Sequence, residues 1–278
     1  MSMFKVISSI FFYVILGQNA QAVLKGMPDI YRAFPEVVQI GFQVSESEFG
    51  HCTATILGDY TLLTARHCVE SFVEHDKIRR LIQINGKENS VMNVFELKEY
   101  SPLYKRFLLA RQKIEKAKDS ATVAEEDDII EFELTHKQLI PFDVALIRTK
   151  MQIDKSIPRV TVSYKIQAQH IEVDLAGYGY TQRNDQGKFS GPNNLHYGSN
   201  VLFNYENHYL EIMGSFIDDN DTRALTALGD SGGPLFLKGT KIQVGVLRGG
   251  EYNLEYDLPS SVYVPLSRWK NFIQKNIK

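Results

Sequence analysis

Short runs of apolar or alternating apolar and polar residues recur along most of the chain. Examples are "EVVQIGFQV", "TATIL", "FDVALIRT", "IEVDLAGYGY", "KIQVGVLRGG" and "SSVYVPL", and glycine, aspartate and other turn residues separate them. Strands that are half buried alternate in this way, and many short strands joined by turns are typical of a β-sandwich or β-barrel. The pattern therefore predicts an all-β protein rather than a helical bundle.

Two segments depart from the strand pattern. From about residue 103 to residue 138 the chain is charged, with "RFLLARQKIEKAKDS" favouring a helix and "EEDDIIEFEL" opening on acidic residues. We interpret this segment as a charged, partly helical insertion on the surface. The last segment, "PLSRWKNFIQKNIK", predicts an amphipathic C-terminal helix whose apolar face is formed by Leu266, Trp269, Phe272, Ile273 and Ile277.

The N-terminal end has the features of a secretory signal peptide. Lys5 precedes the apolar run "VISSIFFYVIL", and Ala20 and Ala22 then form the small-x-small pattern of a signal peptidase site. A membrane anchor is the alternative, but the run falls well short of the roughly 20 residues that a spanning helix needs. We therefore predict that residues 1–22 are removed. The mature domain, residues 23–278, would be secreted to the extracellular or periplasmic space without stable membrane association.

Composition and charge are those of an ordinary globular protein. The chain has 278 residues, 44% of them hydrophobic and 23% charged, and its formal net charge is -2. These values indicate no nucleic-acid partner. The two cysteines, Cys52 and Cys68, are predicted to form one disulfide because an exported protein meets oxidising conditions. Two buried thiols are the alternative.

The string "ALGDSGGPLF", residues 227–236, contains the first candidate for chemistry. Glycine and aspartate are common in turns, so its composition alone favours a turn. A serine there becomes a nucleophile only if a base takes its proton and a carboxylate fixes the tautomer of that base. His67 in "LLTARHC" follows an apolar run, and Asp143 in "PFDVALIRT" leads one. These contexts make His67 and Asp143 candidate partners of Ser231.

The order of these residues decides between two classes of hydrolase. "GDSGG" also matches G-x-S-x-G, the nucleophile elbow of α/β-hydrolases, in which the histidine follows the serine. No histidine lies in residues 232–278, which excludes that class. The order His67, Asp143, Ser231 is that of chymotrypsin-type proteases.

Several motifs resemble the chymotrypsin/trypsin family of serine proteases. "LTARHC", "FDVALI" and "GDSGGP" are similar to its T-A-A-H-C, D-I-A-L-I and nucleophile signatures, and Cys52 and Cys68 have the spacing of its disulfide beside the histidine. The resemblance runs from about Val23 to Lys278, apart from the charged insertion. It implies two six-stranded antiparallel β-barrels with the active site in the cleft between them.

The resemblance also implies a function. It predicts a secreted serine endopeptidase that works through an acyl-enzyme intermediate, takes protein or peptide substrates and needs no cofactor. Protein inhibitors are further candidate partners. The sparing use of cysteine favours a bacterial-type secreted member of the family.

Three of the candidate residues receive their roles from the resemblance. Ser231 Oγ would attack the scissile carbonyl, His67 would accept and return its proton, and Asp143 would orient the imidazole. The backbone N–H groups of Gly229 and Ser231 would bind the developing oxyanion. Glycine suits position 229 because it accepts backbone angles closed to other residues.

Asp230 and the start of the mature chain form a further expected pair. In the family this aspartate forms a salt bridge with a newly exposed N-terminus, and the salt bridge shapes the oxyanion loop. The predicted cut would expose "VLKG", which begins at Val23. We therefore hypothesise that removal of the signal peptide itself activates the enzyme, through a salt bridge between Val23 and Asp230.

The expected specificity pocket departs from that of trypsin. Leu225 stands six positions before the nucleophile, where trypsin-like enzymes carry an aspartate, and Gly250 and Ser261 are expected to complete the pocket. A leucine cannot pair with Lys or Arg, so we expect a small or apolar P1 residue. The family's S-W-G appears as Arg248, Gly249 and Gly250, so the serine that usually supports the catalytic aspartate is missing.

Two questions stay open at the level of sequence. The acidic run at residues 125–128 is either a calcium site, as in some relatives, or a solvated face, the commoner role of consecutive acids. The other histidines lack H-x-x-x-H spacing, which argues against a catalytic metal.

The competing function is a non-catalytic protease homologue that acts as a binding protein, an outcome known in this family when a triad residue is replaced.

Overall fold

The structure is a computed structural model. It describes residues 23, 25–43, 49–70, 81–84, 87–120, 124–165, 168–179, 182–183, 189–190, 194–206, 209–214, 221–253 and 256–277. The predicted signal peptide, residues 1–22, lies outside the described residues.

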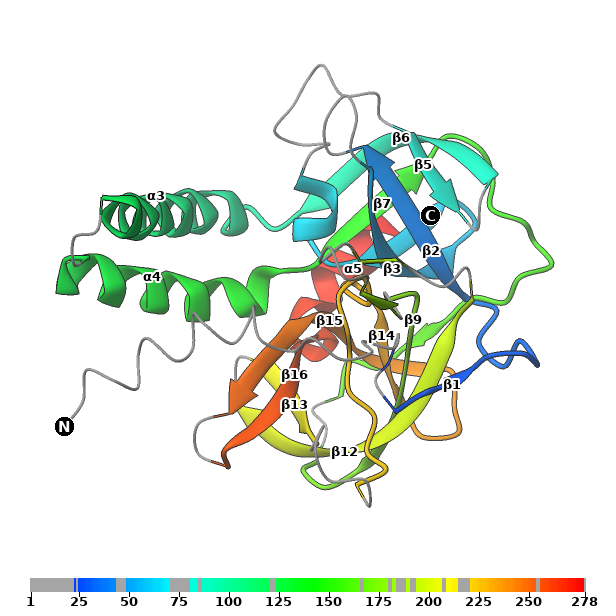
Figure 1. Ribbon diagram of the computed structural model, residues 1–278. Helices are drawn as coiled ribbons and strands as arrows, with labels where there is room; N and C mark the ends of the chain where they lie inside the picture. The colour runs from blue at the N-terminus through cyan, green and yellow to red at the C-terminus, as the bar shows by residue number, and fades with distance from the viewer. Residues whose placement is uncertain are drawn as a thin grey trace.

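Six antiparallel strands form a first, closed barrel (Figure 1). They are β2 (Val37–Gln43), β3 (Phe49–Gly58), β4 (Thr61–Thr64), β5 (Leu81–Ile84), β6 (Lys87–Glu96) and β7 (Ala145–Thr149). The order around the barrel is β2-β3-β4-β7-β6-β5. The apolar residues of "TLLT" in β4 and "ALI" in β7 are buried, so the apolar runs of the sequence fill the barrel core.

The second barrel is a sheet whose ends meet. Its strands are β1 (Met27–Pro28), β8 (Thr161–Val162), β9 (Glu172–Gly177), β12 (His196–Glu206), β13 (Tyr209–Met213), β14 (Pro234–Leu237), β15 (Ile242–Asn253) and β16 (Leu258–Pro265). Strand β12 pairs with β13 at one end of the path β12-β13-β16-β15-β14-β9 and with β9 at the other. The all-β prediction with two barrels is therefore confirmed. A separate pair, β10 (Gln182–Arg183) and β11 (Phe189–Ser190), completes the described strands.

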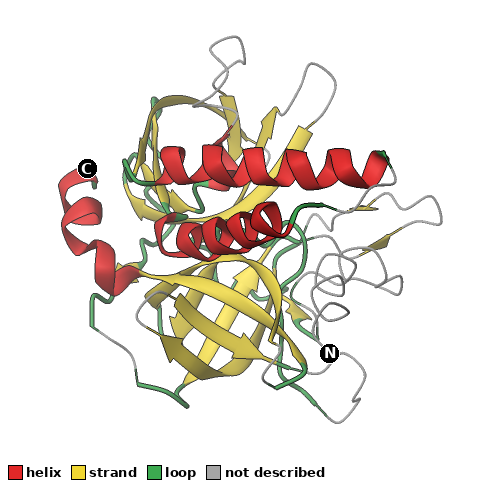
Figure 2. Cartoon of the chain, turned by 90° about the vertical axis from the view of Figure 1, so that its left-hand side faces the viewer, coloured by secondary structure: helices red, strands yellow, loops and turns green. Residues whose placement is uncertain are grey.

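The charged insertion is a helical hairpin that projects from the barrels (Figures 1 and 2). It consists of α3 (Tyr100–Asp119) and α4 (Glu126–Leu139), which join β6 to β7. Oppositely charged side chains link the helices: Arg106 pairs with Glu131 at 2.9 Å and Lys113 with Asp128 at 2.6 Å. The acidic run therefore forms the N-cap and the first turn of α4, where acidic side chains interact favourably with the helix dipole. One of these acids, Asp128, forms the ion pair with Lys113 of α3.

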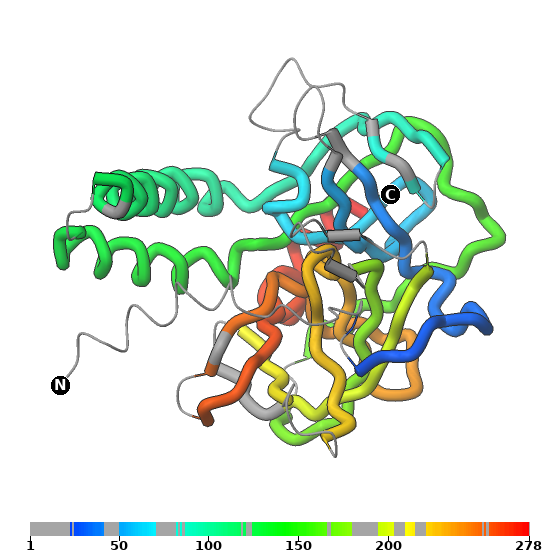
Figure 3. The backbone as a smooth tube through the Cα atoms, in the orientation of Figure 1, coloured from blue at the N-terminus to red at the C-terminus, as the bar shows by residue number. Residues whose placement is uncertain are grey.

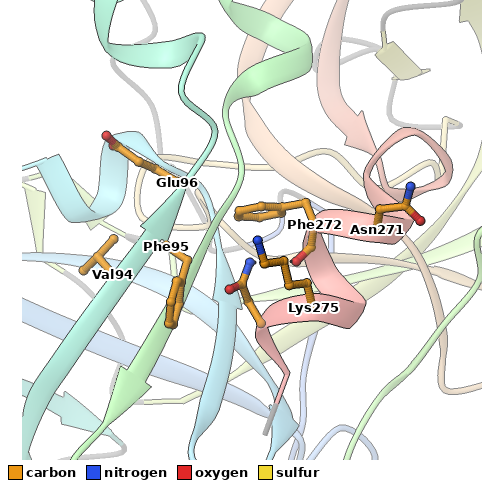
Figure 4. A pocket seen from close by; sticks show the side chains of 7 residues that line it. Val94, Phe95, Glu96, Asn271, Phe272 and Lys275 are labelled. Atoms are coloured by element: carbon orange, nitrogen blue, oxygen red, sulfur yellow. Dashed lines mark hydrogen bonds between the residues drawn. The ribbon is translucent and has the colours of Figure 1, made fainter.

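The C-terminal segment forms the predicted helix and returns to the first barrel. It comprises the 3-10 turn η3 (Leu266–Trp269) and α5 (Lys270–Asn276), and its end lies against the first barrel although the preceding strand belongs to the second (Figure 3). Arg148 Nη2 of β7 donates to the Asn276 carbonyl at 2.7 Å. A pocket of about 540 Å³ separates residues 94–96 of β6 from Phe272 and Lys275 of α5 (Figure 4).

Candidate active site

Strand register brings His67 and Asp143 together. In the first barrel Thr64, the last residue of β4, pairs with Ala145, the first residue of β7, so the segment after β4 and the segment before β7 lie at the same end of the barrel. His67, in the 3-10 turn η1 (His67–Val69), has Nδ1 2.7 Å from Asp143 Oδ2. Its backbone N–H also donates to Asp143 Oδ1 at 2.9 Å. Both carboxylate oxygens are thus committed to one histidine.

The segment before Asp143 is fixed by the C-terminal part of the chain. The 3-10 turn η2 (Ile140–Phe142) ends at Asp143, whose N–H donates to the Ile140 carbonyl at 3.3 Å. Trp269 Nε1 donates to the Pro141 carbonyl at 2.7 Å, and its ring lies 5.5 Å from that of Phe142. The C-terminal helix therefore holds the turn that presents the carboxylate.

Asp143 is buried, with only 3% of its surface exposed. Burial by itself raises the pKa of this carboxyl group, but His67 and the guanidinium of Arg248 outweigh burial and hold the pKa below its usual value of 3.8. His67 is more open, because a third of its side chain is exposed. The pair thus combines a buried carboxylate with an imidazole that is partly exposed to solvent.

Ser231 approaches the pair from the second barrel. The backbone N–H of Thr53 donates to the Ser231 carbonyl at 2.8 Å, and Cys68 Sγ lies 3.6 Å from that same oxygen and 3.8 Å from His67 Nε2. Ser231 Oγ makes a long hydrogen bond of 3.5 Å to the Arg248 carbonyl. Catalytic hydrogen bonds are often long before substrate binds.

The loop before Ser231 requires glycine at position 229. Its φ is +98°, and a Cβ there would lie 2.5 Å from His51 Nε2 and 3.0 Å from Gly179 Cα. His51 Nε2 lies 3.0 Å from the Tyr178 carbonyl, so it packs under the loop, and burial lowers the pKa of this imidazole. Within the described part of the chain, no acceptor is bonded to the N–H groups of Gly229 and Ser231.

Asp230 turns away from this loop into the second barrel and meets Val23. Its Oδ2 accepts from the backbone nitrogens of Val23 at 3.0 Å and Ala227 at 2.7 Å, and its Oδ1 accepts from Gly179 at 2.6 Å. The carboxyl group is buried, and burial raises its pKa to about 6 although these three N–H groups oppose the rise. In the full chain Val23 N is a peptide N–H group and carries no full positive charge.

The predicted disulfide between Cys52 and Cys68 is present, with an S–S distance of 2.06 Å. It joins β3 to the residue after His67 and so ties the histidine to the barrel wall. These cysteines and His67 also bring three possible metal ligands within 4.8 Å of one another. Because both sulfurs are in the disulfide, neither is a thiolate that could bind a metal ion.

The residues expected in the specificity pocket lie in the second barrel. Leu225 is 2% exposed and packs in the same apolar cluster as Val23, while Ser261 is fully buried. Thr226, which the sequence analysis did not select, donates through its hydroxyl to Ser261 Oγ at 2.8 Å and through its N–H to the same oxygen at 3.1 Å. A Cβ at Gly250 would touch only the Ser260 carbonyl, at 3.8 Å. The candidate lining is uncharged.

A second group of residues near Asp143 was missed by sequence reasoning. Arg248 Nη1 donates to Glu251 Oε1 at 3.1 Å, and the same oxygen lies 3.6 Å from His136 Nε2 of α4. On the other side, the guanidinium of Arg66 lies over the Tyr100 ring at 4.8 Å. The base of the hairpin thus contacts both barrels beside the candidate triad.

This fold and this arrangement define a class of protein: two antiparallel β-barrels with a His–Asp pair and a serine where they meet. The sequence model of the trypsin family matches residues 29–273, and the chain therefore belongs to the trypsin family. No curated protein matches the sequence closely enough to count as a relative.

Solved structures share the fold. Neuropsin, a serine protease expressed in the limbic system of mouse brain, is similar over 91% of this chain and 99% of its own, with 18% identity and a TM-score of 0.58. A scabies mite inactivated protease paralogue is similar over 90% of this chain and 97% of its own, with 14% identity and a TM-score of 0.58. Among the described residues, none of the helices has both the length and the apolar character needed to cross a bilayer.

Proposed function

We propose that the protein is a secreted serine endopeptidase that hydrolyses peptide bonds through His67, Asp143 and Ser231. The observation that carries the proposal is the double hydrogen bond of the buried Asp143 carboxylate to His67, at 2.7 Å and 2.9 Å. This contact favours the imidazole tautomer with Nδ1 protonated, which leaves Nε2 as the basic nitrogen for the proposed proton transfer.

The mechanism follows from these positions. His67 Nε2 takes the proton of Ser231 Oγ as the oxygen attacks the scissile carbonyl, and the tetrahedral oxyanion accepts from the N–H groups of Gly229 and Ser231. The imidazolium then protonates the leaving amine, and the acyl-enzyme forms. Water then gives a proton to His67 as it attacks the ester carbonyl. The imidazolium returns that proton to Ser231 Oγ as the acyl–oxygen bond breaks, and the carboxylic acid leaves. Asp143 stays ionised throughout and stabilises the imidazolium.

A fluorophosphonate probe tests the proposal against the alternative of a non-catalytic binding protein, the class to which the similar mite paralogue's name points. We expect covalent labelling of the mature protein at Ser231 and none of the Ser231→Ala variant. An unlabelled mature protein that starts at Val23 would favour the binding protein.

For the P1 residue we propose a small or apolar side chain. The residues that support this are uncharged: Leu225, Thr226, Gly250 and Ser261 offer no carboxylate to a Lys or Arg side chain. A library of peptides derived from a proteome, digested with the enzyme and sequenced, measures the preference. Dominant cleavage after Lys or Arg would contradict it.

Activation by removal of the signal peptide, residues 1–22, is supported by the 3.0 Å contact between Val23 N and Asp230. We expect a protein that keeps Ala22 before Val23 to be about 10²–10³-fold less active than one that starts at Val23, because a buried carboxylate without its ion partner costs about 3–5 kcal/mol. Kinetics on the two purified forms measure the difference. Equal activity, or a secreted protein whose sequenced N-terminus lies well downstream of Val23, would contradict the prediction.

Burial of the Asp230 carboxyl group gives the full chain, in which Val23 N is a peptide nitrogen, a pH-dependent stability. The folded pKa of Asp230, about 6, lies above its usual value of 3.8, so the folded uncut chain binds more protons than the unfolded chain between these values. Its stability therefore falls as the pH rises from about 4 to above 6, by roughly 3 kcal/mol from this group. An ammonium group at Val23 would favour the carboxylate and reduce that fall.

A further inference from the structure

The pocket between β6 and the C-terminal helix α5 is separate from the candidate triad. Its volume is about 540 Å³, which lies within the range of small-molecule sites. Val94, Phe95 and Phe272 are partly buried and pack against the core of the first barrel, so apolar side chains line both sides. The full lining is Val94, Phe95 and Glu96 of β6 with Asn271, Phe272, Lys275 and Asn276 of α5 (Figure 4).

One positive charge in this pocket is unpaired. The Lys275 side chain points from α5 towards β6 (Figure 4), and its ammonium group has no ion pair or hydrogen bond with any residue that the structure describes. The acid in the lining, Glu96, is already committed: its Oε2 pairs with Arg66 Nε, and its Oε1 accepts from Ser101 Oγ at 3.3 Å. The pocket therefore offers a cation, but no free carboxylate, to a ligand.

A second positive charge lies next to the β6 side of the pocket. The guanidinium carbon of Arg148 is 4.8 Å from the centroid of the Phe95 ring, and its Nη2 donates to the Asn276 carbonyl at 2.7 Å. The Nε of Arg148 is buried and has no acceptor among the described residues. Residues 266–276 add no anion, because they include three basic residues and no Asp or Glu. The charges around the pocket thus favour an anionic ligand.

We propose that this pocket binds a small monocarboxylic acid with an apolar body, and that the bound acid supports the His67–Asp143 pair. The carboxylate pairs with Lys275, and the apolar body contacts Phe95 and Phe272. The ligand site itself is independent of the proposed function, whereas its effect on the pair rests on that function.

The α5 side of the pocket is linked to Asp143. Trp269 lies in η3, three residues before the lining residue Phe272, and its Nε1 donates to the Pro141 carbonyl at 2.7 Å. Its ring also lies 5.5 Å from that of Phe142. Pro141 and Phe142 belong to the turn that ends at Asp143. A ligand that holds Phe272 in place therefore also restrains the turn that presents the carboxylate.

The β6 side of the pocket is linked to His67. Glu96, the last residue of β6, pairs with Arg66, the residue directly before His67. Glu96 also lies opposite Ala145 of β7, two residues after Asp143. The conformation that contains this pocket also contains the His67–Asp143 contact. A ligand that fits the pocket favours this conformation, because a ligand shifts an equilibrium towards the state that it binds best.

Calorimetric titration of the protein with octanoate tests the ligand site. Octanoate should bind, and octanamide, which has the same chain without the charge, should bind about fivefold more weakly. Lys275→Glu replaces attraction by repulsion and should weaken the binding of octanoate roughly tenfold. The matched control is Lys270→Glu, the same charge change at the first residue of α5, which does not line the pocket; it should leave the affinity unchanged.

Three results would overturn the ligand site. They are equal affinities for octanoate and octanamide, equal affinities of Lys275→Glu and Lys270→Glu for octanoate, and neither heat nor a change in Trp269 emission at millimolar octanoate. Thermal unfolding establishes that both variants are folded. If Lys275→Glu does not fold, the comparison of octanoate with octanamide on the wild-type protein decides.

The effect on the His67–Asp143 pair has two readouts. Trp269 is the only tryptophan in the sequence, so its fluorescence reports on the link through α5 without turnover. Octanoate should shift this emission in the wild type and, with a neutral peptide amide as substrate, raise kcat/KM about fivefold. Lys270→Glu should respond in the same way, and Lys275→Glu should not respond at the same concentration.

An unchanged emission, or an unchanged or lower kcat/KM, would overturn the support of the pair. A lower value in all variants would show that octanoate competes with substrate in the cleft. If the wild-type protein neither hydrolyses peptides nor takes a fluorophosphonate label, the proposed function fails, while the titrations with octanoate still test the ligand site.

Discussion

The Ser231→Ala variant is expected to lose on the order of 10⁶-fold in kcat, as when the nucleophile of a triad is removed in other serine hydrolases. The hydroxyl oxygen is the atom that bonds to the substrate carbonyl, and alanine leaves nothing for His67 to deprotonate. The residual rate would come from substrate binding and from the N–H groups of Gly229 and Ser231. Steady-state hydrolysis of a peptide ester or amide measures the loss.

A matched control is Ser120→Ala at the end of α3. Ser120 is exposed, and its hydroxyl donates to the Lys116 and Ala117 carbonyls of α3 at 2.8 Å and 3.2 Å. Its removal should leave kcat and KM unchanged. Retention of more than a tenth of the wild-type rate by Ser231→Ala would show that another group is the nucleophile.

Local patterns were sufficient to predict an all-β fold, and the two-barrel architecture came from the resemblance of the motifs to the family. Each strand core carried its own apolar or alternating run, and the long charged segment at about 103–138 could not belong to a barrel because it has no such run. The C-terminal helix followed from one apolar stripe that includes Trp269 and Phe272. The disulfide followed from a count of two cysteines and an oxidising compartment.

The contacts around the site could only partly be predicted. Motif order suggested that His67 and Asp143 are partners, and the pairing of β4 with β7 gives a physical reason for their contact. The ion pair of Arg248 with Glu251 and its approach to His136 depend on a bulge and on how a hairpin far away in sequence packs. Hydrophobic periodicity predicts neither the position of a bulge nor the packing of the hairpin, so this ion pair could be identified only from the structure.

The specificity pocket shows a similar limit. Leu225 was chosen as the base of the specificity pocket because it lies six positions before Ser231. Only the fold shows that Leu225 packs in the core of the second barrel and that Thr226 is hydrogen-bonded to Ser261. Sequence could identify the position but not the direction of the side chain. The contact between the Thr226 and Ser261 hydroxyl groups, which makes part of the candidate lining polar, was therefore not predicted from the sequence.

The Asp143→Asn variant is expected to lose about 10⁴-fold in kcat, from the example of a triad in which this substitution leaves the geometry intact but favours the wrong tautomer. Asp143 accepts two N–H groups of His67, one on each oxygen. An asparagine has only one acceptor oxygen, and its NH₂ group would face a nitrogen or N–H of His67. The imidazole then rotates or changes tautomer, and Nε2 no longer accepts the Ser231 proton.

Stability measurements separate this chemical effect from unfolding. The folded pKa of Asp143 lies below 3.8, so the carboxylate contributes stability above that value, and the contribution is lost as the pH falls through the folded pKa. Denaturation of Asp143→Asn at several pH values should lack this component. Asp127→Asn, in the exposed first turn of α4, is the matched control and should keep both the rate and the acid dependence. A folded Asp143→Asn protein within tenfold of the wild-type kcat would mean that the carboxylate does not fix the tautomer of His67.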